Sequence, residues 1–177
     1  MSRLVDFHRG TATDSEGRWL RDLWKWNDDD LEAVHDFIQW MFPLPEPSQF
    51  NPDAPLLTEE DIAAFRADAT LRANLRCSYD RILSFVGLTS HDGTIKEGPN
   101  FSARAAYVWT APNHNWLRIT RILRSLTLLG LAPEAQALYA CLSAFHQSRR
   151  FPIPDSTFRY WTVAVRSKNL QPPTSRG

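Results

Sequence analysis

Hydrophobic residues recur at spacings of three and four positions along most of the chain, whereas the strict alternation typical of strands is scarce. This periodicity is typical of helices that bury one apolar face. We therefore predict an all-α fold, a single compact domain of roughly six to seven packed helices, with one long proline-rich loop and one long loop containing Gly and Pro. The domain is expected to span residues 1–170, and residues 171–177 to form a flexible tail.

Two helices are predicted before the proline-rich loop. The first runs from about Ser15 to Trp24. The second starts after Asn27, a residue type that caps helix N-termini, and its apolar residues recur as far as Phe42. Pro43 ends this helix because proline cannot continue one. Residues 43–55 contain five prolines and predict an extended connection.

The middle of the chain has clearer helix boundaries. Thr58 and Asp61 have the spacing of a capping box, which predicts a helix that begins directly after Thr58. A longer helix is predicted from about Ala69 to Val86, ended by Gly87 in a left-handed conformation. Residues 88–112 mix Gly, Pro, polar and aromatic residues and receive no firm assignment, although part of them fits a short helix.

Three helices are predicted in the last third of the chain. Asn113 caps the strongest of them, which ends at Gly130 and is apolar on two sides, as in a helix packed between others. Pro133 stands in the first turn of the next helix, where proline is favoured. The last helix is expected from near Asp155 to about Asn169.

Composition and the cysteines indicate an ordinary globular protein of a reducing compartment. A chain of 177 residues with 43% hydrophobic and 23% charged residues can build a core without cross-links. No apolar run approaches the length of about 20 residues that a membrane span needs, and the first residues do not resemble a signal peptide. Cys77 and Cys141 lie in apolar helical patterns and are predicted to be buried free thiols. We expect a cytoplasmic protein, or a nuclear one in a eukaryote.

Charge is distributed unevenly although the net charge is zero. Residues 1–97 carry 10 Lys and Arg against 18 Asp and Glu, whereas residues 98–177 carry 10 against 2. One interpretation is that the acidic part packs beside the basic part and neutralises it. The other is that the basic part presents arginines to an anionic partner, such as nucleic acid, phosphate or an acidic peptide.

Motifs of known catalytic or metal chemistry are missing from the sequence. The five histidines occur singly, and no HExxH, GxGxxG, GxxxxGK[ST] or GxSxG pattern is present. Asp28, Asp29 and Asp30 do not continue into a calcium loop and suit a helix start instead. We therefore predict no catalytic residue, no metal site and no cofactor.

Two polar sets are candidates for ligand binding. On the predicted helix before Pro43, His35 and Gln39 flank the apolar arc and Trp40 lies on the opposite side. These three either contact a ligand, or pack and hydrogen-bond within the protein. The second set stands at the start of a later helix, whose free N–H groups and positive dipole suit an anion or carboxylate. Its members are Asn113, His114, Asn115, Arg118 and Arg121. Alternatively, these arginines pair with the acidic part of the chain.

Several sequence blocks resemble one protein family. The two best marked are VHDFIQWMFPL at residues 34–44 and NWLRITRILRSLTLLGL at residues 115–131. FHRG, LLTEEDIAAF and SYDRILSFVGL add to them in the same order. Together they resemble the conserved region of the opioid growth factor receptor family over nearly the whole chain, in a minimal, microbial form.

The resemblance implies a helical domain with a receptor or binding role, since vertebrate members of the family bind an enkephalin-type peptide and are associated with the nucleus and with restraint of cell growth. We expect a domain that binds a peptide or a small anionic ligand near residues 28–42 and the start of the helix after Asn113. An enzyme acting on a phosphorylated or carboxylated metabolite is the alternative, with Arg118 and Arg121 holding the anion and His35 or His114 as acid or base. A scaffold that binds a protein partner through exposed aromatic residues is a third possibility, and nucleic-acid binding has weaker support.

Overall fold

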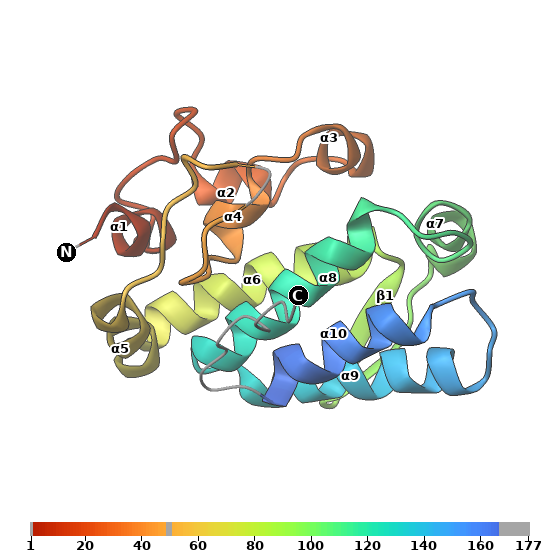
Figure 1. Ribbon diagram of the computed structural model, residues 1–177. Helices are drawn as coiled ribbons and strands as arrows, with labels where there is room; N and C mark the ends of the chain where they lie inside the picture. Colours follow the sequence, from red (N-terminus) through yellow and green to blue (C-terminus); the bar gives the residue numbers. More distant parts are fainter. Residues whose placement is uncertain (1, 49–50, 167–177) are drawn as a thin grey trace, which may run out of the picture.

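The computed structural model describes residues 2–48 and 51–166, which form ten helices and one two-stranded sheet (Figure 1). The helices are α1 Arg3–Arg9, α2 Leu20–Leu23, α3 Asp28–Ala33, α4 Ile38–Met41, α5 Glu59–Ala67, α6 Ala69–Phe85, α7 Phe101–Val108, α8 His114–Leu128, α9 Ala132–Gln147 and α10 Asp155–Arg166. The strands are β1 Leu88–His91 and β2 Thr94–Glu97. The expected end of the last helix near Asn169 and the tail at 171–177 lie outside the described residues.

Helix α8 occupies the middle of the fold and packs on α9 and α10 (Figure 1). Its contact with α10 includes an edge-to-face pair between Trp116 and Trp161, whose ring centroids are 6.4 Å apart. The indole Nε1 of Trp161 also donates a hydrogen bond to the Trp116 carbonyl at 3.2 Å. Leu128 is buried, as expected of a helix packed between others, but Leu117 is 59% exposed. One side of α8 therefore reaches solvent.

Several predicted helix boundaries are confirmed by their caps. The Thr58 side chain accepts a hydrogen bond from the Asp61 amide and the Asp61 side chain accepts one from the Thr58 amide, which completes the capping box of α5. Gly87 follows α6 with a φ of 83°, and Asn113 caps α8. Helix α9 has its proline in the first turn. These boundaries depend on local hydrogen bonds, so the local sequence identifies them.

The predicted helix from Asn27 to Phe42 is wrong in its extent, because the chain breaks it into α3 and α4. Val34 has extended dihedrals and ends α3. The carbonyls of Leu31 and Val34 accept hydrogen bonds from the buried guanidinium of Arg118, each at 2.8 Å. A charged donor from α8 thus satisfies the carbonyl end of α3, which removes the need for a continuing helix.

The first 25 residues also differ from the prediction. Helix α1, with Ser2 as its N-cap, was not predicted. The helix expected from Ser15 is reduced to α2, because the carboxylate of Asp14 accepts hydrogen bonds from the amides of Glu16 and Arg18, both at 2.9 Å. These bonds hold residues 14–18 in a turn instead of a helix.

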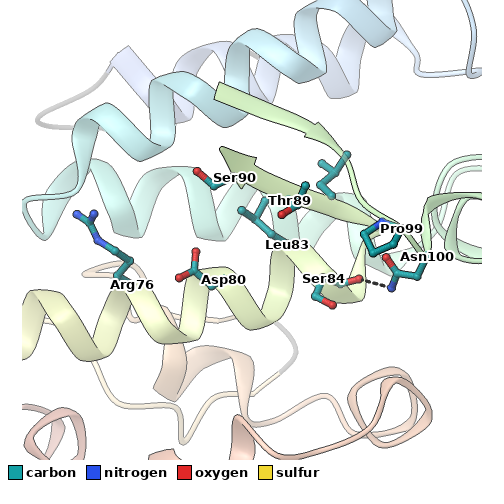
Figure 2. Close-up of a pocket in the computed structure, with 9 residues that line it drawn as sticks. Arg76, Asp80, Leu83, Ser84, Thr89, Ser90, Pro99 and Asn100 are labelled. Carbon is teal, nitrogen blue, oxygen red and sulfur yellow. Dashed lines mark hydrogen bonds between the residues drawn. The ribbon is translucent and has the colours of Figure 1, made fainter. Parts of the chain in front are cut away.

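The unassigned residues 88–112 contain the sheet and α7, so the fold is mostly helical and not all-α. Strands β1 and β2 pair antiparallel, and Asp92 and Gly93, with φ of 48° and 74°, form the tight turn between them. In Figure 2, β1 is the strand nearer to α6, and β2 lies beyond it. Helix α9 packs on β2.

Burial of the two free thiols was predicted wrongly. Cys77 is exposed and Cys141 is only partly buried. Cys77 lies on α6 between Leu75 and Tyr79, which are both buried, but on the opposite side of the helix. The prediction relied on the usual burial of free cysteine and not on the position of Cys77 relative to the apolar stripe of the helix.

The acidic and basic parts of the chain meet in space. Arg104 lies 3.7 Å from Asp28 and 4.0 Å from Glu32. The guanidinium groups of Arg124 and Arg150 pair with the carboxylates of residues 46 and 97, respectively. The structure therefore favours the interpretation in which the two parts of the chain neutralise each other.

Candidate functional site

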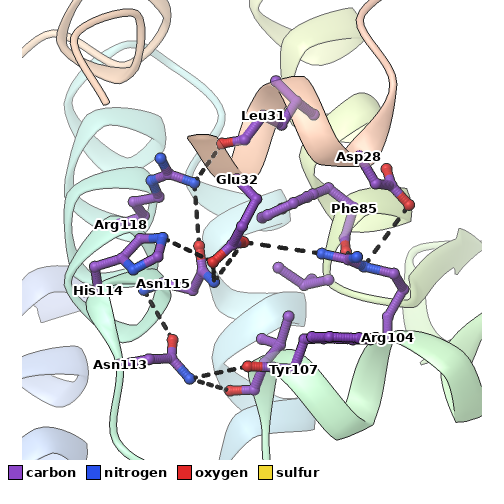
Figure 3. Close-up of polar contacts among 12 residues, drawn as sticks. Asp28, Leu31, Glu32, Phe85, Arg104, Tyr107, Asn113, His114, Asn115 and Arg118 are labelled. Carbon is purple, nitrogen blue, oxygen red and sulfur yellow. Dashed lines mark hydrogen bonds and ion pairs between the residues drawn. The ribbon is translucent and has the colours of Figure 1, made fainter. Parts of the chain in front are cut away.

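The polar residues predicted at the start of α8 form a connected group with α3 and α7 (Figure 3). We name this group the α3–α8 cluster. Its members are Asp28, Glu32, His35, Arg104, His114, Asn115 and Arg118. It joins four of the predicted site residues, His35, His114, Asn115 and Arg118.

Arg118 is the centre of the cluster and is only 7% exposed. Besides the Leu31 and Val34 carbonyls, its guanidinium donates to Asn115 Oδ1 and lies next to His35 Nδ1, both at 3.1 Å. Burial lowers the pKa of Arg118 to about 10, so the group remains charged at neutral pH. Its two terminal nitrogens are thus occupied by protein acceptors.

Glu32 is the acidic residue that contacts Asn115 and His114 in the cluster. Its carboxylate accepts a hydrogen bond from Asn115 Nδ2 at 3.1 Å and lies 3.1 Å from His114 Nε2. Arg104 lies on its far side and donates to the Phe85 carbonyl at 2.6 Å. Each charge in this region therefore has an opposite charge or a polar partner beside it.

The two histidines of the cluster are in contact, with ring centroids 4.8 Å apart. The pKa of His114 is lowered, first because burial disfavours the imidazolium ion and second because the charge of Arg118 repels it, whereas Glu32 acts in the opposite direction. His114 is therefore neutral at pH 7. A neutral imidazole beside a buried guanidinium can accept a proton, but it attracts no anion by charge.

Asn113 fills the N-terminus of α8 with its own side chain. The Oδ1 atom accepts a hydrogen bond from the Asn115 amide at 2.9 Å. The Nδ2 atom donates to the carbonyls of Tyr107, Val108 and Ala111 at 3.2, 3.0 and 2.8 Å. The side chain thus ties α8 to the end of α7, and an anion at this helix start would have to displace it.

The remaining predicted site residues lie away from the cluster. Arg121 donates to the Phe42 carbonyl at 3.1 Å, and burial lowers its pKa to about 10. Gln39 is buried, and with its amide nitrogen toward the backbone it donates to the Asp36 carbonyl at 2.8 Å. Trp40 is buried against Phe7 of α1, with ring centroids 5.3 Å apart. These residues contact protein, and the structure does not bring them together with the start of α8.

An open groove lies elsewhere, between α6 and β1 (Figure 2), and the sequence did not predict it. We name it the α6–β1 groove. Its volume is about 690 Å³, within the range of about 300–1,000 Å³ that is usual for ligand sites. It is lined by Arg76, Asp80, Leu83, Ser84, Leu88, Thr89, Ser90, Pro99 and Asn100. The buried side chains of Leu83 and Leu88 supply its apolar part, and its rim is polar.

Arg76, Asp80 and Ser90 also line a smaller cavity of about 170 Å³ beside the hairpin turn. Here Arg76 forms an ion pair with Glu134, the first acidic residue of α9. The second carboxylate oxygen of Glu134 is buried without a hydrogen-bond partner among the described residues. Desolvation by burial raises the pKa of Asp80, the charge of Arg76 opposes this effect, and the charge of Glu134 adds to it. Two carboxylates and one guanidinium thus lie at this end of the groove.

Among residues 2–48 and 51–166, no group of three or more His, Cys, Asp or Glu residues could hold a metal ion. Over the same ranges, no helix is both long and apolar enough to cross a membrane. The structure thus defines a mostly helical domain with a closed polar cluster and an open groove between α6 and β1.

Residues 15–172 match the family described as the opioid growth factor receptor conserved region, and the chain belongs to this family. The opioid growth factor receptor of Rattus norvegicus is 36% identical over 177 residues, which cover 96% of this chain and 30% of that protein. The same receptor of Homo sapiens is 35% identical over 86% of this chain, and opioid growth factor receptor-like protein 1 of Mus musculus is 36% identical over 82%. The chain spans 24 to 32% of the length of these relatives. No solved structure matches the chain.

Proposed function

We propose that the chain is a receptor-like binding domain that holds a short peptide in the α6–β1 groove. The observation that supports this most is the groove itself, an open volume of about 690 Å³ with buried leucines beneath a polar rim. Apolar contacts with a few fixed polar groups are what a peptide or drug-sized ligand needs. The relatives are named receptors for an opioid growth factor, which agrees with a binding role.

The groove supports a binding role better than the α3–α8 cluster does. Both terminal nitrogens of Arg118 already donate to protein atoms, and the start of α8 is filled by Asn113. A small anion there would replace several charge-assisted hydrogen bonds, each worth about 1.5–3 kcal/mol, with bonds of similar strength. Little net affinity would remain.

A second candidate function, an enzyme on an anionic metabolite, has one specific observation in its favour. His35, His114 and Arg118 converge, and the pKa values of His114 and Arg118 are both lowered. Such a convergence of perturbed groups is a feature of catalytic sites. The contacts of Arg118 with protein atoms nevertheless favour a structural role of the cluster over a catalytic one.

Calorimetric titration with a peptide panel that includes enkephalin-type peptides tests the proposed function. The variant Ser84→Trp places an indole in the groove from an exposed position on α6, and Ser102→Trp makes the same change at an exposed position on α7, outside the groove. We expect a peptide that binds the unaltered protein and Ser102→Trp, and that loses at least tenfold in affinity for Ser84→Trp. Equal affinity for the two variants, or binding of no peptide, would contradict the proposal.

Thermal unfolding supplies a second readout on the same samples. A ligand at about 100 times its dissociation constant stabilises the folded state by roughly 2.7 kcal/mol, which raises the midpoint of a domain of this size by about 5–10 °C. This shift should disappear in Ser84→Trp and persist in Ser102→Trp.

A further inference from the structure

Strand β1 has one edge without a partner strand, because the sheet of the described residues contains only β1 and β2. The register pairs Thr89 with Lys96, Ser90 with Ile95 and His91 with Thr94. In an antiparallel pair that closes with a two-residue turn, the pair next to the turn exchanges hydrogen bonds, and the bonding then alternates. The backbone groups of His91 and Thr89 therefore face β2.

The backbone groups of Leu88 and Ser90 consequently point away from β2. Both residues line the α6–β1 groove, and Figure 2 shows β1 as the strand that borders it. No hydrogen bond from their N–H or C=O groups to another part of the described chain is present beyond the sheet. Leu88 is only 1% exposed, whereas Ser90 is exposed to solvent. The N–H and C=O groups of Ser90 are therefore a template for the backbone of an added strand, as at other free strand edges.

The groove also has a charge preference at the end where β1 approaches its turn. Arg76 is already paired with Glu134, and the carboxylate of Asp80 makes no hydrogen bond or ion pair with another described residue. Two carboxylates and one guanidinium leave a net negative charge beside Ser90. A cation from a ligand would complete this group of charges, whereas an anion would be repelled.

We propose that the peptide held in the α6–β1 groove binds as a third strand on the free edge of β1 and places a cation against Asp80. This inference rests on the proposed function and specifies the conformation and charge of the ligand. The N–H and C=O groups of Ser90 bond to the peptide backbone, and the cation is either a basic side chain or the free α-amino group. Backbone hydrogen bonds provide affinity of low sequence specificity, and Asp80 selects the register.

Two short probe peptides distinguish the two sources of the cation. Acetyl-Lys-Val-Thr-Val-Thr-amide carries its charge only on the lysine side chain, and Leu-Val-Thr-Val-Thr-amide only on its α-amino group. Acetyl-Glu-Val-Thr-Val-Thr-amide is the control of opposite charge. We expect at least one cationic probe to bind tenfold or more tightly than the acidic one. Asp80→Asn should abolish this difference, and Asp53→Asn, at an exposed residue outside the groove, should retain it.

Hydrogen exchange of the protein amides, measured with and without the bound probe, tests strand addition directly. The amide of Ser90 should exchange at least tenfold more slowly in the complex. The amides of Thr89 and His91, already paired with β2, should change by less than twofold. Ser90→Pro removes the outward N–H without removing a β1–β2 bond, and it should weaken binding at least tenfold, whereas Ser90→Thr should not.

The failure of this inference differs from failure of the proposed function. Peptide binding that is lost in Ser84→Trp, but occurs without selective protection of the Ser90 amide, would overturn strand addition and leave a peptide-binding groove. Equal affinity for the acidic and cationic probes would overturn the charge preference. If none of the three probes binds, strand addition is overturned, while other peptides in the calorimetric panel still decide the proposed function.

Discussion

Arg118→Met separates a structural role of the α3–α8 cluster from a ligand-binding role. Methionine keeps much of the volume of the side chain and removes the charge and the hydrogen-bond donors. The carbonyls of Leu31 and Val34 then lose donors at 2.8 Å in a region where Arg118 is only 7% exposed. Water cannot easily replace these donors.

The expected loss of stability follows from the two backbone contacts. A hydrogen bond to a charged group contributes about 1.5–3 kcal/mol, so the two bonds together contribute at least about 3 kcal/mol. For a domain of this length, each kcal/mol corresponds to roughly 2–4 °C in midpoint, which gives an expected decrease of about 6–12 °C. Loss of the contacts to Asn115 and His35 adds to this value.

Urea and thermal unfolding followed by circular dichroism measure this loss, with Arg159→Met as the matched control. Arg159 is exposed on α10 and makes no hydrogen bond or ion pair with another described residue, so its substitution should change stability by less than about 0.5 kcal/mol. If Arg118→Met were as stable as Arg159→Met, the structural role of Arg118 would be refuted. A ligand-binding role for this arginine would then regain support.

Three further predictions concern other parts of the fold. Burial lowers the pKa of His8 from 6.5 to about 4, so the folded state requires neutral His8 and loses stability as the pH falls from about 6.5 to 4, by at most about 1.4 kcal/mol per pH unit. Urea unfolding at several pH values should show a shallower pH dependence of stability in His8→Leu than in the unaltered protein. Parallel curves for the two proteins would contradict this prediction. Gly87→Ala should destabilise the fold by about 1–3 kcal/mol in urea unfolding, because φ is 83° and the new Cβ would lie 3.0 Å from the Phe101 Cα. An unchanged unfolding midpoint would contradict the expected backbone strain at this position. Asn113→Ala should lower the free energy of unfolding by about 1–2 kcal/mol in urea unfolding, because it removes the α8 cap. Asn113→Asp should restore only the cap, because a carboxylate cannot donate to the carbonyls at the end of α7. Full recovery of stability in Asn113→Asp would show that those bonds contribute nothing.

Helix boundaries with local causes could be predicted from the sequence. The capping box at Thr58, the cap at Asn113 and the left-handed Gly87 each depend on residues within a few positions. The break at Val34 could not be predicted, because Arg118, which donates a hydrogen bond to the Val34 carbonyl, lies 84 positions away in the sequence. The hairpin was missed because its strands have four residues each, too few to display an alternating pattern, although Asp92 and Gly93 are a strong turn signal.

The candidate site shows the same division between local and distant causes. His114, Asn115 and Arg118 are close because they share the first turns of α8, and the sequence indicated this. His35 joins them only because α3 ends where it does. The α6–β1 groove has no signature in one segment of sequence, since it exists only when the hairpin folds back along α6.

Chemical-shift mapping of the isotope-labelled protein with the tightest-binding peptide of the panel tests the central claim most directly. If the peptide occupies the α6–β1 groove, the largest changes will fall on the amides of Asp80, Ser84, Ser90 and Asn100, with small changes at Glu32, His35 and His114. Changes concentrated on the latter three residues would contradict the groove as the binding site and would assign the ligand to the α3–α8 cluster.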